Sequence, residues 1–355
     1  MIAAPERILI FHTAFIGDIL LMLPMVQILR RQFPKSSITV VTRPDVAELV
    51  RAHPAVTDVV PYDKKGKHSG VGGMLTLARQ LRERRFDLAV VPHRSLRSAL
   101  VVFMGQIPRR VGFSNSAGAL LFTDRVKYHA GDHEIDRDIR LLQPVVGFTP
   151  GRELPALGIP DADVRAAASI LSAAEQRHPG FTRRPVIALA PGSVWSTKRW
   201  PAASYGELAG KLARDGCSVI LLGAARDRDL CEEVIQTAAH DDAILNAAGT
   251  TSLTGTGELL RRSRVLVSND SAPVHIALGV GTPVIALFGP TVPAIGFAPV
   301  GPHDRLVEVA GLPCRPCNIH GGNECPIGSF ECMRGISVVR VLSAVHAIIS
   351  GQRAG

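Results

Sequence analysis

The stretch RILIFH at residues 7–12 is followed by the loop TAFIGD at 13–18 and by the largely apolar stretch ILLMLPMVQILRRQF at 19–33. A second short apolar run, Ser37–Val41, comes next. A strand, a loop, a helix and a further strand in this order form the βαβ unit of an open parallel sheet. The first half of the chain therefore predicts a doubly wound α/β domain.

The second half of the chain repeats this order. PVIALA at 185–190 is followed by the loop PGSVWSTKRWP at 191–201, a helix-like stretch Ala202–Arg214 and a further apolar run, Ser218–Gly223. We therefore expect a second α/β domain with the same architecture as the first. Neither domain has a Gly-x-Gly-x-x-Gly sequence or a P-loop lysine after a strand, which argues against a nicotinamide dehydrogenase and a P-loop phosphotransferase.

Further apolar runs extend the two predicted sheets; they are Leu88–Val91, Val265–Ser268 and Val284–Phe288. Residues 148–185 are rich in Pro, Gly, Ala and charge and contain a helical pattern at 161–177, so we place the linker there. The predicted domains span residues 1–175 and 181–355. The C-terminal helix either stays with the second domain or packs back on the first.

The charge of the chain is unevenly distributed. Forty Lys and Arg against 31 Asp and Glu give +9, and residues 1–180 hold +7 of this excess (24 against 17). The excess is modest and aromatic residues are only 5% of the chain, so we do not expect nucleic acid as a partner. An anionic partner is expected to meet the first half.

The sequence predicts a cytoplasmic protein. The range 271–303 has no Asp, Glu, Lys or Arg, but prolines and glycines interrupt it too often for a membrane span. Glu6, Arg7 and Asp18 also interrupt the N-terminal region in a way that a signal peptide does not tolerate. Contact with a membrane surface remains open.

Candidate residues in the first half follow predicted strands. Ligands of open α/β sheets bind beyond the carboxyl ends of the strands, which places these residues at the binding edge. Asp18 is a lone carboxylate in the first loop, where it either serves as a general base or caps the helix; a capping carboxylate has a lowered pKa. His93, Arg94 and Arg97 follow the strand at 88–91, and we expect them to face an anionic acceptor.

Candidate residues in the second half suit a diphosphate. Lys198 follows a strand together with small hydroxyl residues; the alternative is a solvated charge pair with Arg199. Asp227 follows the next strand and either contacts ribose hydroxyls or caps a helix. The stretch NDSAPVH at 269–275 ends a strand and starts a helix, whose amide groups and dipole favour an anion; a capped helix with an incidental histidine is the alternative.

Four of the six cysteines are clustered with the spacing C-x2-C-x7-C-x6-C; they are Cys314, Cys317, Cys325 and Cys332. Only the first pair has a common zinc spacing. We expect a thiol-rich loop without metal, and zinc or disulfides are the alternatives.

The sequence resembles the lipopolysaccharide heptosyltransferases of glycosyltransferase family 9 over nearly its whole length. The resemblance is carried by IGD at 16–18, PHRSLRS at 92–98, KRWP at 198–201, NDSAPVH at 269–275, and LFGPT at 287–291 with the cysteine-rich loop. The histidine–arginine stretch and the cysteine loop are most similar to the heptosyltransferase II branch. The resemblance implies the GT-B fold, in which two Rossmann-like domains face a central cleft.

The resemblance also implies an inverting, metal-independent transfer of heptose from ADP-heptose, with no cofactor besides this donor. It assigns the catalytic role to Asp18. The donor-binding residues that it implies are Ser193, Lys198, Asp227, Asp270, Ser271, Ala272 and His275. The acceptor-binding residues that it implies are Thr13, Gly17, His93, Arg94 and Arg97. Ala272 stands where the family usually has glycine, and Asp227 does not align cleanly.

The implied acceptor is the anionic inner core of lipopolysaccharide, heptosyl-Kdo2-lipid A, at the cytoplasmic leaflet of the inner membrane. The implied location is thus cytoplasmic and peripheral to that membrane. Two other functions stay open: a different nucleotide-sugar transferase or epimerase of the same fold, and a binding protein without turnover.

Overall fold

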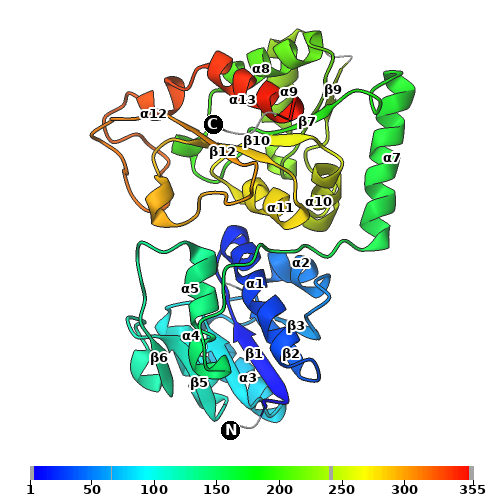
Figure 1. The fold of residues 1–355 in the computed structure, drawn as a ribbon. Coiled ribbons are helices and arrows are strands. Elements are labelled where there is room, and N and C mark those ends of the chain that lie inside the picture. The colour runs from blue at the N-terminus through cyan, green and yellow to red at the C-terminus, as the bar shows by residue number, and fades with distance from the viewer. Residues whose placement is uncertain (1–3, 65, 240–242, 352–355) are drawn as a thin grey trace. The chain divides into compact units, whose positions relative to one another are not determined.

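The computed structural model describes residues 4–64, 66–239 and 243–351. The chain divides into two compact units, Met1–Gly158 and Ile159–Gly355 (Figure 1). Among the helices of the described residues, none combines the length and the apolar composition that a bilayer crossing requires.

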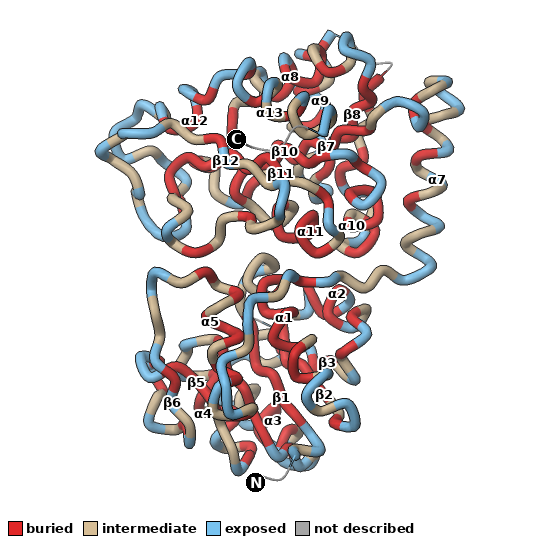
Figure 2. The backbone as a smooth tube through the Cα atoms, viewed as in Figure 1, coloured by how far each residue is buried: buried red, intermediate tan, exposed pale blue. Residues whose placement is uncertain are grey.

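The first unit is built on a six-stranded parallel sheet. In spatial order its strands are β3 (Asp58–Pro61), β2 (Ser37–Thr42), β1 (Arg7–Phe11), β4 (Leu88–Val91), β5 (Arg109–Phe113) and β6 (Asp124–Val126). Strand β1 is buried along almost its whole length, as Figure 2 shows, and β4 is fully buried, because helices cover both faces of the sheet. The β1 residues Leu9 and Phe11 pack into the core on one of these faces.

The helical segments of the first unit are α1 (Ile16–Gln32), η1 (Pro44–Val46), α2 (Ala47–Arg51), α3 (Gly70–Glu83), α4 (Leu96–Met104), η2 (Ala119–Leu121), α5 (Glu134–Arg140) and α6 (Gln143–Val146). Helix α1 is buried almost continuously from Ile19 to Leu29, which explains the absence of an amphipathic pattern in this stretch. Helix α5 packs against α1. Leu77 and Leu81 of α3 and Val102 of α4 pack on the same face of the sheet as Leu9.

The second unit repeats the topology of the first. In spatial order its strands are β12 (Arg305–Glu308), β11 (Val284–Phe288), β10 (Val265–Asn269), β7 (Val186–Ala190), β8 (Ser218–Leu221) and β9 (Ile244–Asn246). Its helical segments are α7 (Asp161–Arg177), η3 (Ser196–Lys198), α8 (Ala202–Arg214), η4 (Ala225–Asp227), α9 (Arg228–Ala238), α10 (Leu253–Arg261), α11 (Ala272–Val280), η5 (Pro293–Ile295), α12 (Glu331–Arg334) and α13 (Val338–Ile349).

The division between the units falls earlier in the chain than we expected. Helix α7, which we placed in the first domain and its linker, belongs to the second unit and packs on α10. The Asp163 carboxylate on α7 accepts hydrogen bonds from Ser252 (2.8 Å) and Thr254 (2.6 Å) at the start of α10. These bonds explain why the helix stays with the second sheet.

The C-terminal helix α13 also packs within its own unit. It contacts α8 and the strands β10, β11 and β12, and Val341 and Val345 are fully buried in the core of the second unit. Of the two placements that the sequence left open for this helix, the structure therefore supports packing on the second unit.

Candidate functional site

Both sheets have the strand order of a Rossmann fold, with the first strand of each unit paired to the fourth. In the first unit the reversal of strand order lies between β1 and β4, and in the second between β7 and β10. The crevice at such a point, beyond the carboxyl ends of the strands, is where ligands of these sheets bind. Almost all predicted site residues lie on the segments that follow these four strands, and Asp227 follows β8.

Asp18 lies in the first turn of α1, directly after the loop that follows β1. The helix begins after Phe15 without a side-chain cap. Instead, the backbone N–H groups of Phe15 and Asp18 donate hydrogen bonds to the Asp18 carboxylate. A carboxylate at the third helical position that accepts a hydrogen bond from the N–H of the N-cap residue forms one half of a capping box. The Asp18 side chain therefore does cap the start of α1, as one of the two interpretations of the sequence has it.

Capping does not lower the pKa of Asp18, because two stronger effects oppose it. Burial raises the pKa of Asp18 to about 7, and the negative charge of Glu134 adds to this effect. The two backbone hydrogen bonds and the positive charge of Arg43 act in the opposite direction but are weaker. A carboxylate with a pKa near the working pH is suited to general base catalysis.

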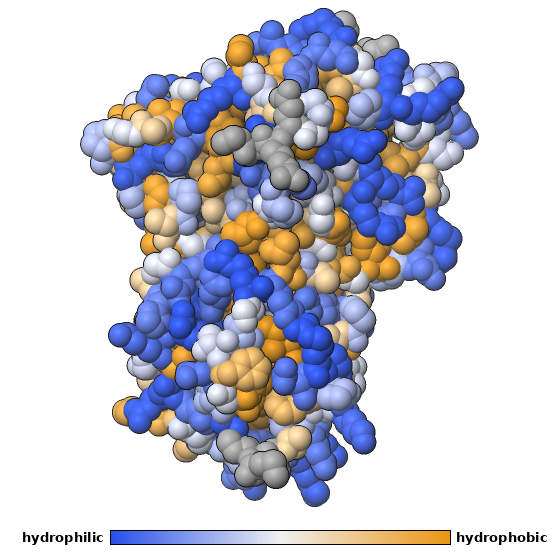
Figure 3. All heavy atoms as spheres, viewed as in Figure 1, coloured by the Kyte–Doolittle hydropathy of each residue, from blue (hydrophilic) through white to orange (hydrophobic). Residues whose placement is uncertain are grey.

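A second carboxyl group, Asp138 on α5, lies in the interior close to Asp18. The Asp138 side chain is fully buried, and neither of its oxygens has a hydrogen-bond partner among the described residues. Burial and the charges of Glu134 and Asp18 raise the pKa of Asp138 well above its usual value. Figure 3 shows hydrophilic residues over the visible side of α5, whereas Asp138 belongs to the buried residues of this helix together with Ile135, Arg137 and Ile139. Asp138 therefore keeps its proton to a higher pH than an ordinary aspartic acid does.

Thr13 and His93 are brought together by the two central strands of the first unit. The Thr13 hydroxyl lies 3.4 Å from Nδ1 of His93, and the Ser98 hydroxyl lies 3.1 Å from the same nitrogen. Burial, with the positive charges of Lys64 and Arg94, lowers the pKa of His93 to about 4. His93 is therefore neutral at pH 7, and it can contact an acceptor through a hydrogen bond.

The two arginines after β4 have different partners. Arg94 is exposed and its guanidinium lies 4.2 Å from the centre of the Tyr128 ring, which leaves its outer edge accessible. Arg97 donates to the Tyr62 hydroxyl (2.6 Å) and to the carbonyl oxygens of His68 (2.6 Å) and Gly70 (3.0 Å). Arg97 thus holds the segment between β3 and α3 in place, a structural task that the sequence did not indicate.

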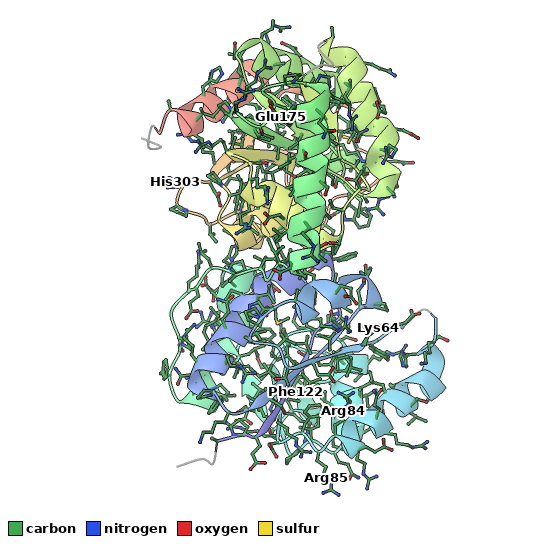
Figure 4. All side chains as sticks on the ribbon, turned by 90° about the vertical axis from the view of Figure 1, so that its right-hand side faces the viewer. Lys64, Arg84, Arg85, Phe122, Glu175 and His303 are labelled. Atoms are coloured by element: carbon green, nitrogen blue, oxygen red, sulfur yellow. The ribbon has the colours of Figure 1, made fainter. Side chains whose placement is uncertain are left out.

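Lys64 is a cation of this site that the sequence analysis did not select. It lies between β3 and α3 (Figure 4), and its ammonium is 5.9 Å from the centre of the Tyr62 ring. Burial and the charges of Arg97 and Arg43 lower the pKa of Lys64 to about 8. The signal was present as DKKGK at 63–67, a lysine cluster directly after a strand. A half-buried cation crowded by other cations favours binding of an anion.

In the second unit, Lys198 and Asp270 form a buried ion pair. The Lys198 ammonium donates to Oδ2 of Asp270 at 2.5 Å, and the Thr291 hydroxyl donates to the same oxygen at 2.7 Å. The pair joins the segments that follow β7 and β10. Lys198 is therefore held by a partner and is not the solvated loop charge of the alternative interpretation. Asp270 positions this ammonium.

Ser271, Ala272 and His275 lie at the start of α11, as the sequence predicts. Ser271 is the N-cap residue, but its hydroxyl bonds to the Asn269 carbonyl (3.2 Å) and not to the helix. The first-turn amides of α11 thus have no side-chain cap from Ser271, which favours an anion at this helix end. His275 is buried, with its ring centre 6.5 Å from that of Phe297.

Three of the predicted donor-site residues lie next to Gly192. Ser193 follows it in the chain, and the Asp227 carboxylate and the Ser271 hydroxyl are close to it in space. A Cβ on Gly192 would lie 2.6 Å from the Asp227 carboxyl carbon, so a larger residue at this position would displace the Asp227 carboxylate. The Asp227 carboxylate accepts a hydrogen bond from Ala224 N–H (2.9 Å), which matches the capping alternative for Asp227. Ser193 is buried, and its carbonyl oxygen accepts two hydrogen bonds from Arg199 (2.9 and 2.7 Å).

Asn269 connects the two central segments of the second unit. Its amide oxygen accepts from the Trp200 N–H (3.0 Å) and the Tyr205 hydroxyl (3.2 Å), and its nitrogen donates to the Pro191 carbonyl (2.8 Å). Asn269 is fully buried. A buried amide with three hydrogen bonds favours a single geometry, so Asn269 sets the relative position of Lys198 and the start of α11.

The cysteine-rich loop supports the segment that carries Lys198. Thr197 donates to and accepts from the backbone of Gly322 (2.7 and 2.9 Å), and Ser196 donates to the Asn323 carbonyl (2.5 Å). All six cysteines are free thiols. Within the described residues, no group of three or more His, Cys, Asp or Glu side chains has an arrangement that could hold a metal ion.

The thiols are expected to differ strongly in their reaction with iodoacetamide. Backbone N–H groups around Cys325, first that of Phe330, lower the pKa of the Cys325 thiol. Burial raises the pKa of the Cys231 thiol to about 12. Since the thiolate is the reactive form, Cys325 should be alkylated first and Cys231 last in a time course at pH 8, followed by peptide mass spectrometry. Equal rates for Cys325 and Cys231, or protection of the four clustered cysteines that a chelator removes, would contradict this assignment.

Two units with Rossmann-type parallel sheets, each with candidate ligand-binding segments beyond its central strands, have the architecture of the GT-B fold. The solved structure of E. coli ADP-heptose lipopolysaccharide heptosyltransferase II has this fold; it matches with a TM-score of 0.79 at 25% identity and covers 98% of this chain and 100% of that chain. The model of glycosyltransferase family 9 (heptosyltransferase) matches residues 74–325. The chain therefore belongs to glycosyltransferase family 9.

Two curated relatives agree with this assignment. The lipopolysaccharide heptosyltransferase 2 of Salmonella typhimurium is 27% identical over 350 residues, which are 97% of this chain and 99% of the relative. The lipooligosaccharide heptosyltransferase 2 of Haemophilus influenzae is 30% identical over 294 residues, which are 81% and 84% of the two chains. The resemblance that the motifs indicated is thus confirmed.

Proposed function

We propose that this glycosyltransferase moves heptose from ADP-heptose to the inner core of lipopolysaccharide, with heptosyl-Kdo2-lipid A as acceptor. The names of the two heptosyltransferase 2 relatives and of the E. coli structure support the sugar, the donor and the pathway. The observation that carries the chemistry is the raised pKa of Asp18 at the carboxyl end of β1.

Asp18 acts as the general base in a single displacement. Its carboxylate takes the proton from the acceptor hydroxyl while that oxygen attacks the anomeric carbon of the heptose. The bond between the anomeric carbon and the diphosphate oxygen breaks on the opposite side, so the configuration inverts and ADP leaves. The family match begins C-terminal to Asp18, so this role rests on the geometry of the first unit.

The second unit binds the donor diphosphate. Lys198 supplies a positive charge held in place by Asp270, and the start of α11 supplies amide groups and the positive end of its dipole. Ser193, Asp227 and His275 complete the proposed donor site, with Asp227 available to ribose through its partly exposed carboxylate. These groups stabilise the negative charge that develops on the leaving ADP, so we expect transfer without a metal ion.

The first unit binds the acceptor. Thr13 lies on the loop before α1, Gly17 directly precedes Asp18, and His93 contacts Thr13. Arg94 together with Lys64 supplies positive charge for the phosphates and carboxylates of the core. The proposed acceptor is linked to a lipid, so the location that we propose for the working enzyme is the cytoplasmic leaflet of the inner membrane. The excess positive charge of the first half of the chain supports this location.

A donor comparison tests the proposed function. The purified protein is mixed with the acceptor and with ADP-heptose, UDP-glucose or UDP-N-acetylglucosamine, and the products are identified by mass spectrometry. We expect addition of one heptose from ADP-heptose only, with activity unchanged in EDTA. Transfer from a UDP-sugar, epimerisation of the donor, or binding of ADP without any transfer would each contradict the proposal.

A further inference from the structure

Helices α3 and α4 and the short segment η2 cover one face of the first-unit sheet, and we call them the α3–α4 layer. Leu77 and Ala78 of α3 and Ala99 of α4 are buried on the sheet side of this layer. Helix α3 packs beside α4, and α4 beside η2. The other side of the layer faces away from the core.

The outer side of the α3–α4 layer carries large apolar side chains that the fold does not use. Val71 and Leu75, one turn apart on α3, are 67% and 48% exposed. Leu96 and Phe103 on α4 are each 48% exposed, and Leu120 on η2 is 88% exposed. Most of the exposed large apolar side chains of the first unit lie on this layer, although it is a small part of the unit.

The same layer is rich in positive charge and poor in negative charge. Arg79 and Arg82 are exposed on α3, and Arg85 follows its last turn (Figure 4). The Arg110 guanidinium lies 5.5 Å from the centre of the Phe103 ring. Glu83 is the one acidic residue within α3, and α4 has none.

We propose that the α3–α4 layer is the surface by which the protein lies on an anionic phospholipid bilayer. Separate apolar side chains surrounded by arginines suit the boundary between headgroups and acyl chains, where the apolar groups insert and the guanidinium groups meet phosphates. The inference rests on the proposed function for its biological setting, because a lipid-linked acceptor requires the enzyme at a bilayer.

The charges also decide between a bilayer and a second copy of the chain. In a symmetric dimer through this layer, each patch would meet itself, so the arginines of one copy would lie against those of the other. Like charges at such an interface are unfavourable. An anionic bilayer complements both the arginines and the apolar side chains.

Flotation with lipid vesicles tests this surface directly. The full-length protein is mixed with vesicles of phosphatidylethanolamine and phosphatidylglycerol, or of phosphatidylcholine alone. We expect binding to the anionic vesicles, weak binding to the neutral ones, and loss of binding in high salt. The double substitution Leu75→Asp and Leu120→Asp should lower the partition coefficient for anionic vesicles by roughly tenfold or more.

Phe148→Asp is the matched control, since Phe148 is 51% exposed in the same unit but lies outside the layer. Its partition coefficient should equal that of the wild type. Equal loss in the control, no binding of the wild type to anionic vesicles, or a dimer that the double substitution dissociates would overturn the proposal.

A transfer assay separates this inference from the proposed function. With a detergent-solubilised acceptor and ADP-heptose, the double variant should retain wild-type turnover, while its transfer to acceptor embedded in anionic vesicles should fall. Vesicle binding by the wild type with no heptose transfer would remove the proposed function alone. Transfer by a wild-type protein that does not bind vesicles would remove the bilayer surface alone.

Discussion

Replacing Asp18 with asparagine is expected to lower turnover by about two to four orders of magnitude, the range typical of loss of a general base. Asparagine keeps the size and the helix-capping capacity of the side chain but cannot accept the proton of the acceptor hydroxyl. ADP affinity, measured by calorimetry, should stay within a few-fold of the wild type, because the proposed donor site belongs to the second unit. Turnover close to wild type would remove Asp18 from the mechanism.

Stability measurements show whether such a loss comes from unfolding. Because the pKa of Asp18 is raised from 3.8 to about 7 in the folded protein, this group lowers the free energy of unfolding progressively as the pH rises from about 4 to about 7, and the loss is complete above that pH. Asp18→Asn should therefore raise the free energy of unfolding at pH 8 and change it little near pH 4. Asp136→Asn is the matched control, because Asp136 is paired with Arg152 on the outside of α5 and its pKa is lowered.

The pH dependence of the wild-type enzyme follows from the same group. The base must be ionised to act, so kcat/KM should rise with pH through about 7 and level off above about 8. In Asp18→Asn the rise of kcat/KM through pH 7 should be absent, because the group that titrates has been removed. A profile that is already flat from pH 5 would mean that Asp18 keeps an ordinary carboxyl pKa.

Lys198→Ala is expected to weaken ADP binding by about 1.5–3 kcal/mol, the range for hydrogen bonds to charged groups, which is roughly 10- to 150-fold in Kd. The substitution also leaves the buried Asp270 carboxylate with Thr291 as its remaining side-chain partner. The stability of Lys198→Ala should fall for this reason.

A double variant distinguishes the two effects. Lys198→Ala combined with Asp270→Asn removes the uncompensated carboxylate, so stability should recover while ADP affinity stays low. Lys211→Ala is the control, since this lysine pairs with Glu207 on the outside of α8. Calorimetry that finds wild-type ADP affinity in the double variant would contradict a diphosphate contact by Lys198.

The fold could be read from the sequence because its strands are short, apolar and bounded by turn residues. The predicted strands at 88–91 and 284–288 and the helices at 161–177 and 202–214 have the observed bounds. The sequence could not show to which unit the helix at 161–177 belongs, because this depends on the hydrogen bonds between Asp163 and the start of α10. Such contacts between distant residues leave no periodic signal.

The sequence could place the candidate site residues on particular loops, but it could not describe their contacts. The loops after the strands indicated Asp18, Lys198 and the start of α11, since ligand sites of these sheets have a fixed place. The pairing of Lys198 with Asp270 and the burial of Asp138 beside Asp18 depend on distances across the fold. Arg97 was expected to meet a ligand, whereas its guanidinium is used by Tyr62 and the backbone.

The repeated strand order has a consequence for how such an enzyme can diversify. Each unit presents its candidate site residues on segments beyond strands whose own side chains are almost wholly buried, so these residues are separate from those that hold the sheet together. Insertions or exchanges after β3 and β4 can therefore alter the proposed acceptor site while the proposed donor site beyond β7 and β10 stays unchanged. A lineage of transferases can in this way adopt new glycan targets and keep one activated sugar.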